Sequence, residues 1–212
     1  MVDTKLSALP QVAVPADLDE LYVNDGGVSK RLTFSDLILY IESRGRQNNA
    51  SVANQGAGFA VDTYLTGSEV LIPTGRLQAK SMYRCRFNVT KTAAGTATPI
   101  VQVRFGTAGS TADVSRASMT FPAQTAAVDD GMFEVFVVFR TLGAAGVVQA
   151  VAQLKHRQSV TGLATLVSPS VATTSAGFDT TVASSRIGVS VNGGTSAAWT
   201  ANLVQAELFN LA

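Results

Sequence analysis

The stretch MFEVFVVFRT at residues 132–141 decides the fold. Two sets of side chains alternate along it, as in an extended strand, and both are largely apolar: Phe133, Val135, Val137 and Phe139 on one face, and Met132, Glu134, Phe136 and Val138 on the other. Strands that are apolar on both faces are typical of positions that are covered on both sides. We therefore expect this strand to lie in the centre of a sheet or to be covered by a second subunit.

Similar strand patterns recur on both sides of this stretch, separated by turns rich in Gly, Ala, Thr and Asp. The expected strands are residues 69–72, 81–90, 100–105, 115–121, 132–141, 147–157, 163–173, 186–191 and 198–211. Long strands joined by hairpin-like turns predict a mainly β fold, an antiparallel β-sandwich. Their number over about 150 residues favours a jelly-roll-like sandwich at 61–212 over the shorter immunoglobulin sandwich.

The first 45 residues have a different character, with more charges and a compact turn. Residues 21–23 and 29–32 flank Asn24-Asp25-Gly26-Gly27, which predicts a tight β-hairpin because glycine adopts the positive φ values of such turns. This small N-terminal module, residues 1–45, has too few apolar residues to be very stable alone. We expect it to rest on its neighbours or on a host surface.

A short helix is expected after the hairpin. Thr33 and Asp36 have the spacing of a capping box, and Gly45 is a typical helix stop, so the helix should run from Phe34 to about Arg44. The next stretch, 46–60, is polar, Gly- and Asn-rich and aperiodic, which predicts a linker to the sandwich.

Composition excludes several classes of protein. The chain has 212 residues, with 16 Lys and Arg against 15 Asp and Glu, so no basic excess indicates a nucleic-acid partner. No apolar run approaches the length of a membrane span, and the polar N-terminus lacks a secretory signal. We therefore expect no nucleic-acid partner and no membrane insertion.

The residues that usually carry catalysis or bind metals are few and scattered. The single cysteine, Cys85, falls on the inward face of its predicted strand, and the single histidine, His156, has no second ligand near it in the sequence. The only adjacent acids, Asp129 and Asp130, lack the alternating oxygen ligands of a calcium loop. The sequence thus predicts no catalytic residues, no metal, no cofactor and no enzymatic activity.

Two surface features leave alternatives open. Arg84, Arg86 and Arg104 form a basic stripe for an acidic partner or an anionic sugar if their strands are neighbours; otherwise they are solvated or paired with acids such as Glu134 and Glu207. Trp199 and Tyr64 are aromatic side chains that could stack on a sugar, although a lone Trp near a long terminal strand is more often part of the core.

Two regions resemble virion proteins of tailed bacteriophages. TKLSALP (4–10) and ADLDELYVNDGGVSKRLTFSDLILYI (16–41) resemble the N-terminal attachment module of tail fibres, tail spikes and related proteins, with Asp25-Gly26-Gly27 and Lys30–Thr33 in place. KTAAGTATPIVQVRFGTAGSTAD (91–113) and FDTTVASSRIGVSVNGGTSAAWTANLVQAELFNL (178–211) are similar to a β-sandwich domain of predicted phage and prophage structural proteins.

This resemblance implies a role and no active site. The expected function is a non-enzymatic bacteriophage virion structural protein, a tail-associated, fibre-like appendage that reaches the virion during assembly in the bacterial cytoplasm. Such proteins are commonly trimeric, so the expected partners are further copies in a homotrimer, other virion proteins and a host surface glycan. Attachment is expected to centre on the apolar residues of the N-terminal module: Leu6, Leu9, Leu21, Tyr22, Leu37, Ile38 and Ile41.

Other functions stay open at this point. The same module would suit a capsid decoration or head-fibre protein, and the sandwich alone would suit a carbohydrate-binding domain that recognises a host receptor. A polysaccharide hydrolase is the least supported, because glycoside hydrolysis needs two carboxylates across the scissile bond and the acids here are scattered.

Overall fold

The computed structural model describes residues 20–25, 28–34, 37, 46–157, 162–166 and 168–211. The contacts between residues divide the chain into two units, Met1–Arg44 and Gly45–Ala212. Within the described residues, no helix combines the length and the apolar character needed to cross a membrane.

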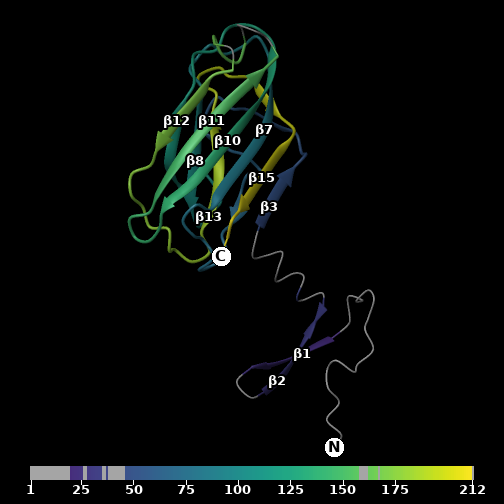
Figure 1. The fold of residues 1–212 in the computed structure, drawn as a ribbon. Helices are drawn as coiled ribbons and strands as arrows, with labels where there is room; N and C mark the ends of the chain where they lie inside the picture. Colours follow the sequence, from purple (N-terminus) through teal and green to yellow (C-terminus); the bar gives the residue numbers. More distant parts are fainter. Residues whose placement is uncertain are drawn as a thin grey trace, which may run out of the picture. The chain divides into compact units, whose positions relative to one another are not determined.

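The N-terminal unit contains the predicted hairpin. Strands β1 (Glu20–Asp25) and β2 (Val28–Thr33) pair antiparallel in a register that runs from Glu20 opposite Thr33 to Asp25 opposite Val28 (Figure 1). Phe34 and Leu37 have helical conformation. The other residues of the helix predicted at 34–44 lie outside the described residues.

The second unit is an antiparallel β-sandwich, as predicted. In the described part of the chain its larger sheet has eight strands: β3 (Arg46–Ser51), β4 (Gln55–Gly58), β7 (Met82–Lys91), β10 (Asp129–Thr141), β11 (Val147–His156), β12 (Ser170–Thr174), β14 (Trp199–Ala201) and β15 (Val204–Phe209). Its smaller sheet has five: β5 (Thr63–Tyr64), β6 (Val70–Leu71), β8 (Ile100–Gly106), β9 (Val114–Thr120) and β13 (Arg186–Asn192).

The strand order explains how distant parts of the chain meet. In the larger sheet β12, β11, β10 and β7 lie side by side in this order (Figure 1). The other side of β7 pairs with β15 along residues 82–87 and with β14 at Thr90 and Lys91. Strands β4 and β3 pair with β14 and β15 at the edge. In the smaller sheet the order is β5-β13-β8-β9, with β6 also beside β13.

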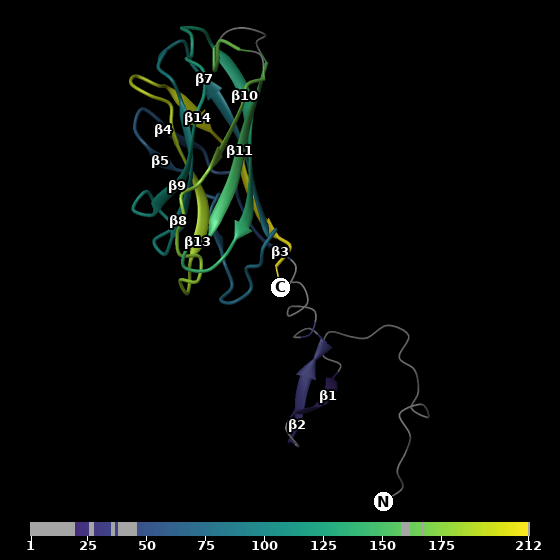
Figure 2. The same ribbon diagram turned by 60° about the vertical axis from the view of Figure 1, so that its left-hand side comes forward.

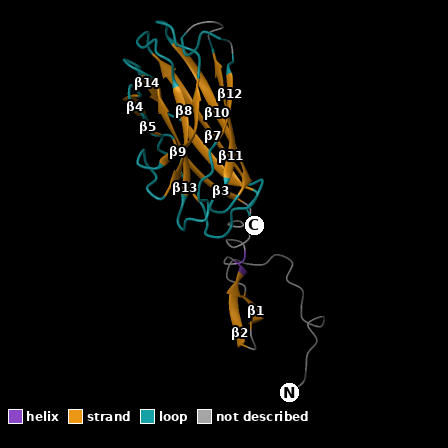
Figure 3. Ribbon diagram, turned by 90° about the vertical axis from the view of Figure 1, so that its left-hand side faces the viewer, coloured by secondary structure: helices purple, strands orange, loops and turns teal. Residues whose placement is uncertain are grey.

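The two sheets stack face to face, as the turned views show (Figure 2, Figure 3). Their inward side chains form one apolar core, in which alternate residues of each long strand are buried. Burial of this apolar surface supplies the main driving force for folding of the sandwich.

The two-sided apolar strand is central, which confirms the first of the two alternatives expected for it. β10 lies between β7 and β11, and its inward residues Phe133, Val135, Val137 and Phe139 are fully buried. On its outward face Met132 is 39% exposed and Phe136 is 37% exposed. The outward face is thus apolar in part, and within this single chain it is open.

The linker predicted at 46–60 is wrong for most of these residues. They form β3 and β4, which pair with β15 and β14, so they belong to the sandwich. β3 has the sequence RQNNAS and is mostly exposed. An edge strand of this kind has no apolar face to produce an alternating pattern, and its hydrogen bonds to β15 hold it in place.

Two further strand predictions need correction. The strand expected at 163–173 is shorter and lies further along, at Ser170–Thr174, because the chain before it makes loop contacts with Asp129 and His156. The strand expected at 198–211 is interrupted at Asn202 and Leu203, which separate β14 from β15.

Cys85 is fully buried, and burial raises the pKa of its thiol from 9.0 to about 12. We expect Cys85 to resist Ellman's reagent at pH 8 in the folded protein and to react within seconds once urea unfolds it. Because the unfolded chain forms the thiolate more readily, the contribution of Cys85 to the free energy of unfolding should fall as the pH rises from about 9 towards 12. Rapid labelling under native conditions would contradict this placement.

Candidate functional site

The predicted attachment residues fall only partly within the described chain. Leu21 and Tyr22 lie on β1, opposite Leu32 and Arg31, and Leu37 follows in helical conformation. The remaining four lie outside the described residues: Leu6, Leu9, Ile38 and Ile41. Their joint role in attachment therefore stays a prediction.

His156 has a structural role in the sandwich. Its side chain is 1% exposed, and its Nδ1 lies 2.8 Å from the carboxylate of Asp129. The same carboxylate accepts the backbone N–H of Leu163, and His156 Nε2 lies 3.0 Å from the backbone oxygen of Leu166. The pair thus fixes the segment 162–166 against the ends of β10 and β11.

Lys91 is the second buried ionisable residue with a structural role. Lys91 is fully buried, and its Nζ donates to the backbone oxygens of Thr92, Thr125 and Ala127 at 2.9, 2.9 and 3.3 Å. Burial lowers the pKa of Lys91, and the nearby Asp129 partly opposes this effect. The ammonium group therefore crosslinks the loop 121–128 to the end of β7.

Arg104 does not join Arg84 and Arg86 in a basic stripe, because it lies in the smaller sheet. It donates to Ser190 Oγ at 2.7 Å and to the backbone oxygen of Thr111 at 3.0 Å, and it forms an ion pair with Asp62. This set of bonds ties the loop 107–113 to the outer face of that sheet.

The other aromatic and metal-site candidates are also accounted for. Trp199 is 1% exposed and donates its Nε1–H to Gln124 at 2.7 Å, which confirms its place in the core. Across the described residues, no group of three or more His, Cys, Asp or Glu side chains is arranged to hold a metal ion.

Tyr64 lies on a hollow of about 300 Å³ at the edge of the smaller sheet, which Glu69 also lines. The Tyr64 hydroxyl is buried without a hydrogen-bond partner in the described structure, and burial raises its pKa to about 12. Glu69 pairs with Arg186. Burial thus disfavours the ionised form of the Tyr64 phenol, and the Glu69 carboxylate is engaged by Arg186.

A groove on the outer face of the larger sheet is the best candidate site. It consists of a hollow of about 160 Å³ and an adjoining shallow depression, and both are lined by Arg86 and Gln205. We call it the β7 groove, because it follows β7 where β10 and β15 flank it (Figure 1). Its lining residues are Arg84, Arg86, Phe87, Asn88, Met132, Leu203, Gln205 and Glu207.

The apolar walls of the β7 groove come from two different elements. Met132 projects from β10, and Leu203 projects from the break between β14 and β15, where it is 49% exposed. The Asn88 side chain holds this break: its Oδ1 accepts the backbone N–H of Asn202 at 3.0 Å and that of Leu203 at 2.8 Å. Asn88 is thus a positioning residue for one wall.

The polar part of the groove is an arginine pair around one carboxylate. Arg84 and Arg86 both donate to Oε1 of Glu134, at 3.0 and 2.6 Å from their Nε atoms, which confirms the predicted pairing with an acid. Arg84 also lies over the ring of Phe136, 5.5 Å from its centroid. The side chain of Arg86 is 43% exposed, and its terminal nitrogens have no partner among the described residues.

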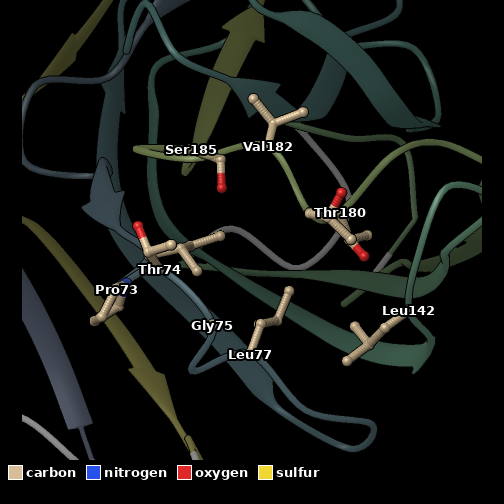
Figure 4. A pocket seen from close by; sticks show the side chains of 10 residues that line it. Pro73, Thr74, Gly75, Leu77, Leu142, Thr180, Val182 and Ser185 are labelled. Atoms are coloured by element: carbon tan, nitrogen blue, oxygen red, sulfur yellow. The ribbon is translucent and has the colours of Figure 1, made fainter.

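A second cavity, of about 230 Å³, lies at one end of the sandwich (Figure 4). The side chains of Leu77 and Ser185 point towards each other from opposite sides, and Thr180 is fixed by a hydrogen bond from the Gly143 N–H to its hydroxyl. Its described lining contains no ionisable side chain. It can accept a small neutral group, but it offers no acid or base.

Sequence analysis found only part of the β7 groove. The alternation of residues 81–90 places Arg84 and Arg86 on one face, but Gln205 and Glu207 lie more than a hundred positions away. They reach the groove because β15 pairs with β7, with Gln205 opposite Arg86 and Glu207 opposite Arg84. No local pattern in the sequence predicts that pairing.

Comparisons with known proteins add little to this geometry. No protein-family model matches the chain, and no curated protein matches it. A solved structure with some similarity is the CBM2 module of the evolved Dit of Lactobacillus casei BL23 phage J-1, at 10% identity and a TM-score of 0.35, over 68% of this chain and 69% of that chain. We draw no conclusion about function from a similarity of this size.

Proposed function

We propose that this chain is a non-enzymatic structural protein of a tailed-bacteriophage virion. In this proposal the N-terminal unit attaches the protein to the particle as a fibre-like appendage of the tail, and the sandwich is the outward, binding part. The observation that carries it is the hairpin of β1 and β2, which forms in the segment that resembles phage attachment modules and belongs to a unit separate from the sandwich.

The ionisable side chains of the sandwich support a role without catalysis. His156 and Asp129, Lys91, and Arg104 are each engaged in contacts that hold loops in place. These four side chains hold loops in place, whereas the β7 groove offers donors, acceptors and apolar walls for binding.

Removal of the N-terminal unit tests the proposal. A variant lacking residues 1–44 keeps β3, and with it every described strand of the sandwich. We expect it to be folded, as judged by the fluorescence of the buried Trp199, and to be absent from purified particles. Full-length protein with Phe136→Ala, which changes an exposed residue of the sandwich, is the matched control and should be incorporated normally.

Immunogold labelling of intact particles locates the protein. Antibody against residues 46–212 should label the tail. Label over the head would make the chain a decoration or head-fibre protein, and it would overturn the tail assignment alone. Absence of label from purified particles would overturn the virion role. Incorporation of the truncated variant into particles would overturn the attachment role of the N-terminal unit.

A further inference from the structure

We propose that the β7 groove binds a saccharide that carries a carboxylate group, such as a uronic acid residue. This inference rests on the proposed function, in which the sandwich is the part of the virion protein exposed to the host surface. It goes beyond that function because it names the site and the chemistry of the ligand.

Unbalanced charge in the groove indicates an anionic group. Arg84 and Arg86 share the single carboxylate of Glu134, so one of the two guanidinium charges is uncompensated. Glu207 pairs with Arg46 at 2.6 Å and does not compensate it. Partly exposed ion pairs are individually weak, but an uncompensated cation on the same face attracts an anion over a distance of about one Debye length, ~8 Å at physiological salt.

Lys155 adds a second positive charge at the apolar end. It is exposed, lies opposite Met132 in the pairing of β10 with β11, and makes no ion pair with any described residue. The groove therefore has positive charge near both of its ends. The carboxylates of Glu134 and Glu207 in the same face oppose a more highly charged group such as a phosphate monoester, which favours a singly charged carboxylate.

Arg86 has the geometry to receive that carboxylate. Its Nε is used by Glu134, whereas its two terminal nitrogens have no partner among the described residues, and its side chain is 43% exposed. A guanidinium binds a planar carboxylate through two parallel hydrogen bonds, which fixes orientation as well as charge. The contact to Glu134 holds the fork in place before the ligand arrives.

The rest of the groove suits a sugar ring. Met132 and Leu203 offer apolar surface for the C–H face of a ring. Gln205 lines the same hollow, and its amide oxygen can accept a hydrogen bond from a sugar hydroxyl. Residues two apart on β7 are about 7 Å apart. The distance from Arg84 to Asn88 along the strand, about 14 Å on the same spacing, leaves room for a short oligosaccharide.

A second copy of the chain is a poorer occupant. A symmetric contact through this face would bring the same surplus of positive charge on both partners together, and like charges across an interface are unfavourable. The exposed apolar residues of the face are also few and only partly accessible: Met132 at 39%, Phe136 at 37% and Leu203 at 49%.

Isothermal titration calorimetry with the full chain tests the proposal. The probes are tetragalacturonate and a hyaluronan tetrasaccharide, each compared with its carboxyl-reduced, neutral counterpart at low and at physiological salt. We expect at least one acidic probe to bind at least tenfold more tightly than its neutral counterpart, with weaker binding at higher salt. The proposal is overturned if neither acidic probe binds, or if the neutral counterparts bind equally well.

Variants at the arginine assign the site. Arg86→Gln should weaken binding of the acidic probe at least tenfold, and Arg86→Lys should restore only part of it, because lysine keeps the charge and loses the fork. Arg140→Gln is the matched control, since Arg140 is an exposed arginine of β10 outside the groove lining. Unchanged binding by Arg86→Gln would overturn the proposal.

Analytical ultracentrifugation of the same variants measures their oligomeric state and so distinguishes a saccharide from a second copy of the chain as the occupant of the groove. If Arg86→Gln changes the oligomeric state, the groove is a contact between copies and the saccharide proposal is overturned. These results are independent of the virion assignment. If antibody labels the particles but the purified protein binds no acidic probe, the proposed function stands and the saccharide proposal is overturned.

Discussion

Replacing Phe133 with alanine is expected to lower the free energy of unfolding by about 3–5 kcal/mol, the usual cost of removing a buried aromatic side chain. Phe133 is fully buried at the centre of β10. Its ring centroid lies 5.0 Å from that of Phe87, 5.2 Å from that of Phe121 and 5.9 Å from that of Trp199. Alanine would leave a cavity among three aromatic rings, which the rigid sheets cannot close.

Phe136→Ala is the matched control for this measurement. It changes the same residue type on the same strand, three positions away, but on the outward face, where Phe136 is 37% exposed. We expect it to cost less than about 1 kcal/mol. Urea denaturation followed by the fluorescence of Trp199 measures both. Equal losses for the two variants would show that the core does not lie between the sheets as described.

Replacing Lys91 with methionine should be nearly as damaging, at about 2–4 kcal/mol. The apolar stem of lysine is largely preserved in methionine, so the loss comes from the three backbone oxygens that the ammonium group now satisfies. Buried acceptors without a donor are costly, because water that bonded them in the unfolded chain cannot follow them.

Lys80→Met provides the comparison for Lys91. Lys80 is exposed and lies just before β7, so the change should shift the urea midpoint little. Hydrogen exchange adds a local measurement: in Lys91→Met we expect faster exchange in residues 121–128 than in the centre of β10. If Lys91→Met were as stable as the parent protein, the three backbone oxygens would have to find other hydrogen-bond donors.

Much of the sandwich could be predicted because its signal is local. In 81–90 the alternation places Tyr83, Cys85, Phe87 and Val89 on one face, and all four are buried. A strand with one buried face reveals itself through its own side chains, whatever lies beside it. The central position of β10 followed in the same way from apolar side chains on both of its faces.

The failures share a cause, which is that the deciding contacts are distant in sequence. β3 is a strand because β15 offers it a hydrogen-bonding edge, and nothing in RQNNAS indicates this. The same alternation that buries Val89 also places Lys91 inward, but a lysine at a strand end is normally solvated. Two of the three carbonyls that accept its hydrogen bonds lie more than thirty positions away. Gln205 and Glu207 of the β7 groove could not be predicted for the same reason, because the pairing of β15 with β7 brings them there.

The pairing of β15 with β7 and β3 also has a consequence for how the protein folds. Arg46 and Glu207, 161 positions apart, form an ion pair across the last ladder of the larger sheet. During synthesis, β15 is the last of the described strands to leave the ribosome, so the stretch of β7 that it pairs with stays open until β15 has been made. Closing such long loops is slow, and folds dominated by distant contacts form in milliseconds to seconds. The surface on β7 that is proposed to bind a saccharide is thus complete only once β15 has paired with β7.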